Sequence, residues 1–206
     1  MKTLKPLLDK NAAWANAQVE QDPEFFKRLE NVQKPKYLWI GCSDSRIPAN
    51  EVLGLAPGEV FVHRNVANQV IHTDFNVLTV LQYAIDVLKV EHIIICGHYG
   101  CGGIKAAIDK PDLGLAENWL QHIRDVYDTH AEELDQLKPD AVETRLGELN
   151  VKHQVKNVAN TTIVQRAWER DQPLYIHGWI YALSDGLLRD LDCCIENQDE
   201  LANFKI

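Results

Sequence analysis

A continuous apolar run, His-Ile-Ile-Ile-Cys at residues 92–96, is the feature that most limits how this chain can fold. A run without polar alternation is typical of a strand that is buried on both faces of a parallel sheet. Segments with the helical spacing of apolar residues separate it from other short apolar runs. This alternation predicts an α/β fold with a mostly parallel central β-sheet flanked by helices. The other strands are expected at residues 36–41, 59–63, 173–182 and 186–192.

Helical spacing predicts two N-terminal helices, a helix capped by Thr73 or Asp74, and two longer helices in the second half. The whole chain, residues 1–206, is expected to form one domain. The helical segments are expected at residues 3–20, 23–31, 73–90, 104–109, 115–137 and 148–170.

Charge and hydropathy exclude several classes of function. The chain has 206 residues and a net charge of −9, which argues against binding nucleic acid. No apolar run approaches the ~20 residues needed to span a membrane. The N-terminal residues lack the apolar region of a signal peptide, so a cytoplasmic location is expected. Five cysteines in such a compartment favour thiols or metal ligands over disulfides.

Two short motifs each follow a predicted strand. Cys42, Asp44 and Arg46 alternate along one loop, and His98 and Cys101 form a short-range pair in another. Because sites in parallel sheets lie at the carboxyl ends of strands, the sheet can bring the two loops together. Two thiolates and one imidazole are a ligand set that holds Zn²⁺ with a fourth position open.

Taken one at a time, these residues have ordinary structural explanations. A lone Cys42 fits a buried core position, and a lone His98 fits a loop. The glycines near 97–103 match neither common nucleotide-binding pattern, which argues against a phosphate site. The remaining cysteines are expected to pack in the interior, and the remaining histidines have no ligand spacing. These are Cys96, Cys193, Cys194 and histidines 63, 72, 92, 122, 130, 153 and 177.

Together, the stretches CSDSR, PGEVFVHRNVAN and GHYGCGGI resemble the β-class carbonic anhydrases, and closely the bacterial enzymes of that class. The resemblance runs from about residue 30 to about residue 192. It implies one zinc ion per subunit, held by Cys42, His98 and Cys101, and reversible hydration of CO₂ to bicarbonate and a proton by zinc-bound hydroxide. Arg46 is expected to position Asp44, and Asp44 to orient the reacting water.

The resemblance also implies a small apolar pocket for CO₂ at a dimer interface, and dimers that pair into tetramers. Residues 1–35 would form a helical arm on the partner subunit, 36–192 the catalytic core and 193–206 a short tail. His63 and His92 are possible proton shuttles. The pocket lining is expected to include Gln33, Phe61, Val66, Tyr83 and the backbone of Gly102.

A further resemblance concerns Trp39, Arg64 and Tyr181. They match the trio that forms a non-catalytic bicarbonate site in one bacterial subgroup of the family. Without the resemblance, an arginine beside two interface aromatics would be the simpler interpretation. The implied regulation is that Asp44 leaves Arg46 and binds zinc, which closes the site, and that bicarbonate favours this form.

Two alternatives remain open from the sequence. One is an enzyme on the same scaffold that hydrolyses a CO₂-like molecule, such as carbon disulfide or carbonyl sulfide. The other is a non-catalytic zinc-binding protein. The presence of Asp44 and Arg46 argues against the second, because a closed structural zinc site needs neither.

Overall fold

The computed structural model describes residues 4–44 and 46–206, and the chain divides into two compact units, Met1–Lys34 and Pro35–Ile206. The first unit contains helices α1 (Lys5–Gln21) and α2 (Phe25–Glu30). Trp14 packs edge-on against Phe26, with ring centroids 5.6 Å apart. Among the described residues of these helices none is buried. Both helices are confirmed, and their role as an arm on a partner stays a prediction.

The second unit is built on a mixed sheet in which the strand order is β2-β1-β3-β4-β5 among the described residues. β1 pairs in parallel with β2 and with β3, and β3 pairs in parallel with β4. β5 is antiparallel to β4. The strands are β1 (Tyr37–Cys42), β2 (Val60–Asn65), β3 (His92–His98), β4 (Tyr175–Tyr181) and β5 (Leu188–Ile195).

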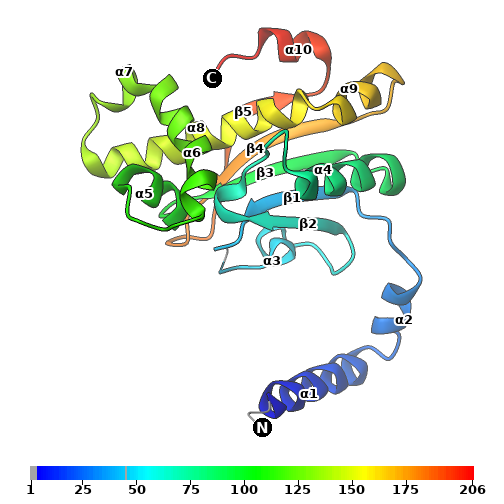
Figure 1. Cartoon of the computed structure of the whole chain (residues 1–206). Helices are drawn as coiled ribbons and strands as arrows, with labels where there is room; N and C mark the ends of the chain where they lie inside the picture. Colours follow the sequence, from blue (N-terminus) through cyan, green and yellow to red (C-terminus); the bar gives the residue numbers. More distant parts are fainter. Residues whose placement is uncertain (1–3, 45) are drawn as a thin grey trace. The chain divides into compact units, whose positions relative to one another are not determined.

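Helices cover both faces of this sheet, with α8 and α9 drawn above it and α3 below it in Figure 1. Asp74 caps α4 by accepting a hydrogen bond from the backbone N–H of Asn76, as the sequence predicts. The helices are α3 (Ala49–Leu53), α4 (Phe75–Gln82), α5 (Gly102–Asp109), α6 (Ala116–Thr129), α7 (Ala131–Leu134), α8 (Pro139–Ala159), α9 (Thr162–Glu169) and α10 (Gln198–Asn203).

The core confirms that the run at 92–96 is buried on both faces. Ile93 and Ile95 join the larger cluster beneath α4, α8 and α9, whereas Ile94 joins the smaller cluster beside α3. At full burial each of these side chains contributes about 1.5–3 kcal/mol to folding. β3 is therefore a central strand, and its carboxyl end is held firmly in place.

Two predicted long helices are in fact interrupted. The segment 115–137 divides into α6 and α7 at His130, whose backbone leaves helical geometry. The predicted helix 148–170 begins earlier, at Pro139, where proline suits a first turn. It ends at Ala159, because Thr161 is extended and caps α9 by accepting a hydrogen bond from Val164. The helical spacing of apolar residues continues across both breaks, so the sequence pattern does not reveal them.

α4 does not end in an ordinary turn. Its helical path continues through a π-helical turn at Tyr83–Leu88, which ends at Lys89 in the left-handed conformation. A carbonyl in this wide turn, that of Ile85, accepts a hydrogen bond of 2.9 Å from the side chain of Gln172. The predicted helix 73–90 is therefore present but is not α-helical throughout.

The C-terminal region differs from expectation in detail. β5 runs to Ile195, beyond the predicted end at 192. Cys193 is buried as expected, but Cys194 is exposed, because successive residues of a strand face opposite sides of the sheet. The described residues contain no helix that is both long enough and apolar enough to cross a membrane.

Candidate metal centre

Three potential ligands converge where two neighbouring strands end. Cys42 is the last residue of β1, and His98 is the last residue of β3. Cys101 immediately precedes α5. Because β1 and β3 are parallel neighbours, their carboxyl ends meet, and one ligand atom from each of the three residues lies within 4.8 Å of the others. All three residues are at most 3% exposed.

The geometry of this cluster suits a tetrahedral zinc ion. The Cys42 and Cys101 sulfurs lie 3.7 Å apart, and two sulfurs at about 2.3 Å from a tetrahedral ion would lie about 3.8 Å apart. His98 Nδ1 lies 3.2 Å from the carbonyl oxygen of Tyr99, which places the ring proton on Nδ1. Its Nε2 is buried without a hydrogen-bond partner among the described residues. A buried lone pair beside two sulfurs fits the role of a metal ligand.

The electrostatics of the cluster favour a cation. The hydrogen bond with Cys101 lowers the pKa of the Cys42 thiol, and His98 and the Ala67 N–H lower it further. The same hydrogen bond, with burial, raises the pKa of Cys101. Burial alone would lower the pKa of His98, but the interaction with Cys42 outweighs it and raises that pKa. The Cys42 thiol thus ionises readily, whereas the Cys101 thiol would need a positive charge beside it to ionise.

Asp44 and Arg46 follow Cys42 by two and four residues, just beyond the end of β1. Arg46 Nη2 is 3.3 Å from Asp44 Oδ2, and both side chains are exposed. Asp44 is not among the clustered ligands. Its carboxylate contacts Arg46 in this structure.

Beside the cluster lies a cavity of about 620 Å³ with mainly apolar walls. Two of the predicted pocket residues, Val66 and Gly102, line it. Phe61 and Tyr83 do not; their rings contact each other elsewhere, 5.8 Å apart, at the edge of the larger core cluster. Gln33 belongs to the unit Met1–Lys34, whereas all residues that line this cavity belong to the unit Pro35–Ile206.

Trp39, Arg64 and Tyr181 lie on one face of the sheet. Paired residues of neighbouring strands share a face, and side chains alternate along each strand. The pairs Gly41–Arg64 and His98–Tyr181 therefore place the three side chains together on that face. The ring of Tyr181 lies 5.8 Å from that of His98. Arg64 donates to the carbonyl oxygen of Ile47 at 3.0 Å. The indole nitrogen of Trp39 is buried without a hydrogen-bond partner in the described part of the chain.

One contributor to the site was not predicted from the sequence. The backbone N–H of Ala67 donates to the Cys42 sulfur at 3.3 Å. Ala67 and Asn68 both adopt positive φ, 61° and 47°. This conformation is unusual for a residue with a β-carbon, and alanine gives no sequence signal for it. The neighbouring asparagine, which tolerates the left-handed region, was the only hint.

Comparison with known proteins agrees with this geometry. The carbonic anhydrase family matches residues 37–188. A carbonic anhydrase from Emericella nidulans is 48% identical over 192 residues, 93% of this chain and 84% of that protein. The structure of a Coccomyxa β-carbonic anhydrase in complex with acetazolamide has a TM-score of 0.91 and 40% identity, covering 98% of this chain and 92% of that one.

A second solved structure, one of two tetrameric β-carbonic anhydrases from the ascomycete Sordaria macrospora, has a TM-score of 0.86 and 40% identity over 93% of this chain and 98% of that one. The predicted bacterial type is not confirmed, since the relative at 48% identity is fungal. The family itself is confirmed by the match over most of the chain and by the shared fold. This chain belongs to the carbonic anhydrase family, in its β class.

Proposed function

We propose that this chain hydrates CO₂ reversibly to bicarbonate and a proton, with one zinc ion per subunit held by Cys42, His98 and Cys101. The observation that carries the proposal is the buried cluster itself, with two sulfurs 3.7 Å apart and an unpartnered His98 nitrogen. A zinc ion in this cluster would polarise a water molecule and lower its pKa, so that the water can attack CO₂ near neutral pH.

The protein's own contribution is to orient the reactants. Asp44 would accept a hydrogen bond from the reacting water and turn a lone pair of that water toward CO₂. Arg46 keeps the carboxylate in position, since the two side chains are already in contact at 3.3 Å. The carboxylate has two oxygens, so one can contact the guanidinium while the other accepts a hydrogen bond from the water.

The apolar cavity beside the cluster is the proposed place for CO₂. Val66 and the backbone of Gly102 would contact it there. Gln33, Phe61 and Tyr83 remain part of the proposal as residues that a second subunit would supply. This arrangement makes a homodimer the smallest complete enzyme, with the helical unit Met1–Lys34 packed on the partner. The tetramers of the Sordaria enzymes support further pairing, and a cytoplasmic location remains the expectation.

Regulation by pH and bicarbonate is the finer part of the proposal. Bicarbonate would bind Arg64 through its charge and would accept hydrogen bonds from the Trp39 indole and the Tyr181 hydroxyl. Three features support this: the shared sheet face, the indole nitrogen that has no hydrogen-bond partner among residues 4–44 and 46–206, and the packing of Tyr181 against His98. Occupation of this site would favour a closed form in which Asp44 leaves Arg46 for the fourth zinc position. A ligand can shift the balance only by binding that form more tightly.

Stopped-flow CO₂ hydration, with and without a zinc chelator, tests the activity directly. We expect rapid hydration that the chelator abolishes and added zinc restores. Turnover of carbon disulfide or carbonyl sulfide, measured in the same preparation, addresses the alternative chemistry. Zinc binding without turnover of any of these substrates would show that the chain only holds the metal.

A further inference from the structure

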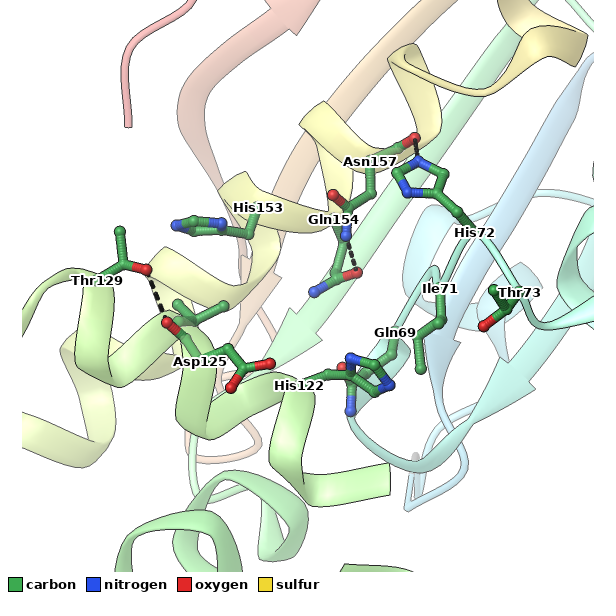
Figure 2. A pocket seen from close by; sticks show the side chains of 11 residues that line it. Gln69, Ile71, His72, Thr73, His122, Asp125, Thr129, His153, Gln154 and Asn157 are labelled. Atoms are coloured by element: carbon green, nitrogen blue, oxygen red, sulfur yellow. Dashed lines mark hydrogen bonds between the residues drawn. The ribbon is translucent and has the colours of Figure 1, made fainter. Parts of the chain in front are cut away.

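A row of buried amide side chains on α8 faces the segment that follows β2. Asn150 Nδ2 donates to the carbonyl oxygen of Ala67 at 3.0 Å, and Gln154 Nε2 donates to Asn150 Oδ1 at 3.0 Å. The backbone N–H of Val70 donates to Gln154 Oε1 at 2.8 Å. Asn157 extends the row, donating to the same Gln154 oxygen at 3.1 Å, as Figure 2 shows.

Backbone groups fix the orientation of the Asn150 and Gln154 amides. The carbonyl of Ala67 can only accept, so Asn150 must present its nitrogen there. The N–H of Val70 can only donate, so Gln154 must present its oxygen there. The remaining Asn150 oxygen and Gln154 nitrogen then face each other as acceptor and donor. Asn150 and Gln154 are at most 2% exposed, so their amides depend on protein partners far more than on water.

The row ends at a residue, Ala67, that contacts the metal cluster. The carbonyl of Ala67 accepts from Asn150, and the N–H of the same residue donates to the Cys42 sulfur at 3.3 Å. Ala67 has a positive φ of 61°, a conformation that persists only when its surroundings hold it. The hydrogen bonds from α8 supply that restraint on the side away from the cluster.

We propose that Asn150 and Gln154 are positioning residues for the metal centre: they hold Ala67 so that its N–H donates to the Cys42 sulfur. The inference rests on the proposed zinc site. A hydrogen bond to a thiolate ligand withdraws charge from the sulfur and orients its lone pairs, and such outer contacts tune a metal site. Asn150 acts directly on Ala67, and Gln154 acts by fixing the orientation of the Asn150 amide.

Two variants test this in the full-length protein. Asn150→Leu removes the contact with Ala67. Gln154→Met keeps the Asn150 side chain but releases its amide oxygen, and it also removes the acceptor of the Val70 N–H. Gln165→Met is the matched control, because Gln165 donates to the carbonyl of Ala159 at 2.7 Å and has no link to Ala67. Folding is checked by urea unfolding. Should Asn150→Leu fail to fold, Gln154→Met carries the test.

Zinc release to excess chelator is the first readout, and the absorption of cobalt-substituted protein is the second. We expect release to be about 10- to 100-fold faster in Asn150→Leu and less accelerated in Gln154→Met. The thiolate-to-cobalt charge-transfer band should move to longer wavelength, since a sulfur without its N–H donor gives up electron density more easily. The control should match wild type in both readouts.

Wild-type release rates and an unshifted cobalt band in both folded variants would overturn the inference. A wild-type protein that takes up no zinc would instead overturn the proposed function. The two failures are distinct, because the first appears only in variants and the second appears before any substitution.

Discussion

The indole ring of Trp39 lies against the backbone of Gly41, two residues further along β1, and its nitrogen occupies the space that a β-carbon on Gly41 would fill. The glycine is therefore what lets a large aromatic side chain lie flat on the sheet at this point. Gly41 directly precedes Cys42, so the packing of the indole and the position of a proposed metal ligand depend on the same missing side chain.

Substitution of this glycine should be costly. Gly41→Ala would force the buried Trp39 ring aside, and we expect a loss of about 1–3 kcal/mol in the free energy of unfolding, measured in urea. Gly147→Ala is the control, because Gly147 lies inside α8 with room for a methyl group and alanine favours helix. Equal stability of Gly41→Ala and wild type would contradict the packing argument.

Loss of one sulfur should empty the metal centre. Cys101→Ala leaves only two of the three proposed ligands, and we expect most of the zinc to be lost on purification, measured by elemental analysis. Cys194→Ser serves as the control, because this cysteine is exposed and lies on β5, away from the cluster. Full zinc content in Cys101→Ala would remove that residue from the ligand set.

Asp44→Asn should keep the fold and the zinc but lose turnover. An amide has one acceptor oxygen and no charge, so it cannot hold Arg46 with one oxygen and the reacting water with another, and we expect CO₂ hydration to fall by about 100- to 10,000-fold. Asp185→Asn is a matched control, since Asp185 also pairs with an exposed arginine, Arg189. Rates like wild type in Asp44→Asn would exclude it from the mechanism.

Much of this site could be predicted because its strongest signals are local. Cys42 with Asp44 and Arg46, and His98 with Cys101, are each close in sequence, and parallel strands bring the two groups together. The contribution of Asn150 could not be predicted. Nothing in the sequence of α8 indicates which backbone carbonyl, 83 positions away, its amide would reach.

The strands of the sheet could be predicted because continuous apolar runs mark them. The interruptions at His130 and Thr161 were missed, because backbone geometry changes there while the apolar spacing does not. Short helices such as α3 and α10 carry too few residues for a periodic pattern.

Variants of the aromatic pair should separate regulation from catalysis. Trp39→Phe removes an indole N–H, and Tyr181→Phe removes a hydroxyl, without opening large cavities. We expect both to retain activity at alkaline pH and to lose much of the inhibition by bicarbonate near neutral pH, measured as hydration rate against bicarbonate concentration. An unchanged pH profile and bicarbonate sensitivity in both variants would reject the regulatory site and leave the zinc assignment intact.

Acid should destabilise the fold partly through His153. Burial, with the nearby charges of His130 and Lys156, lowers the pKa of His153 from 6.5 to about 4. Between these values the unfolded chain binds a proton that the folded chain does not, so stability falls as pH falls through this window. In urea unfolding at several pH values, His153→Leu should show a shallower dependence than wild type. An identical slope would count against this origin.

The wide turn at Tyr83–Leu88 has a consequence for comparing this chain with its relatives. A π turn holds one residue more than the α turn it replaces, so the helix behaves as though a residue had been inserted into it. Alignment to a relative whose helix is regular needs a one-residue gap inside the helix, where gaps are ordinarily penalised. Without that gap, and without one in the connection at residues 89–91, β3 would be matched one residue out of step. Every side chain of that strand, His98 included, would then be assigned to the wrong face of the sheet.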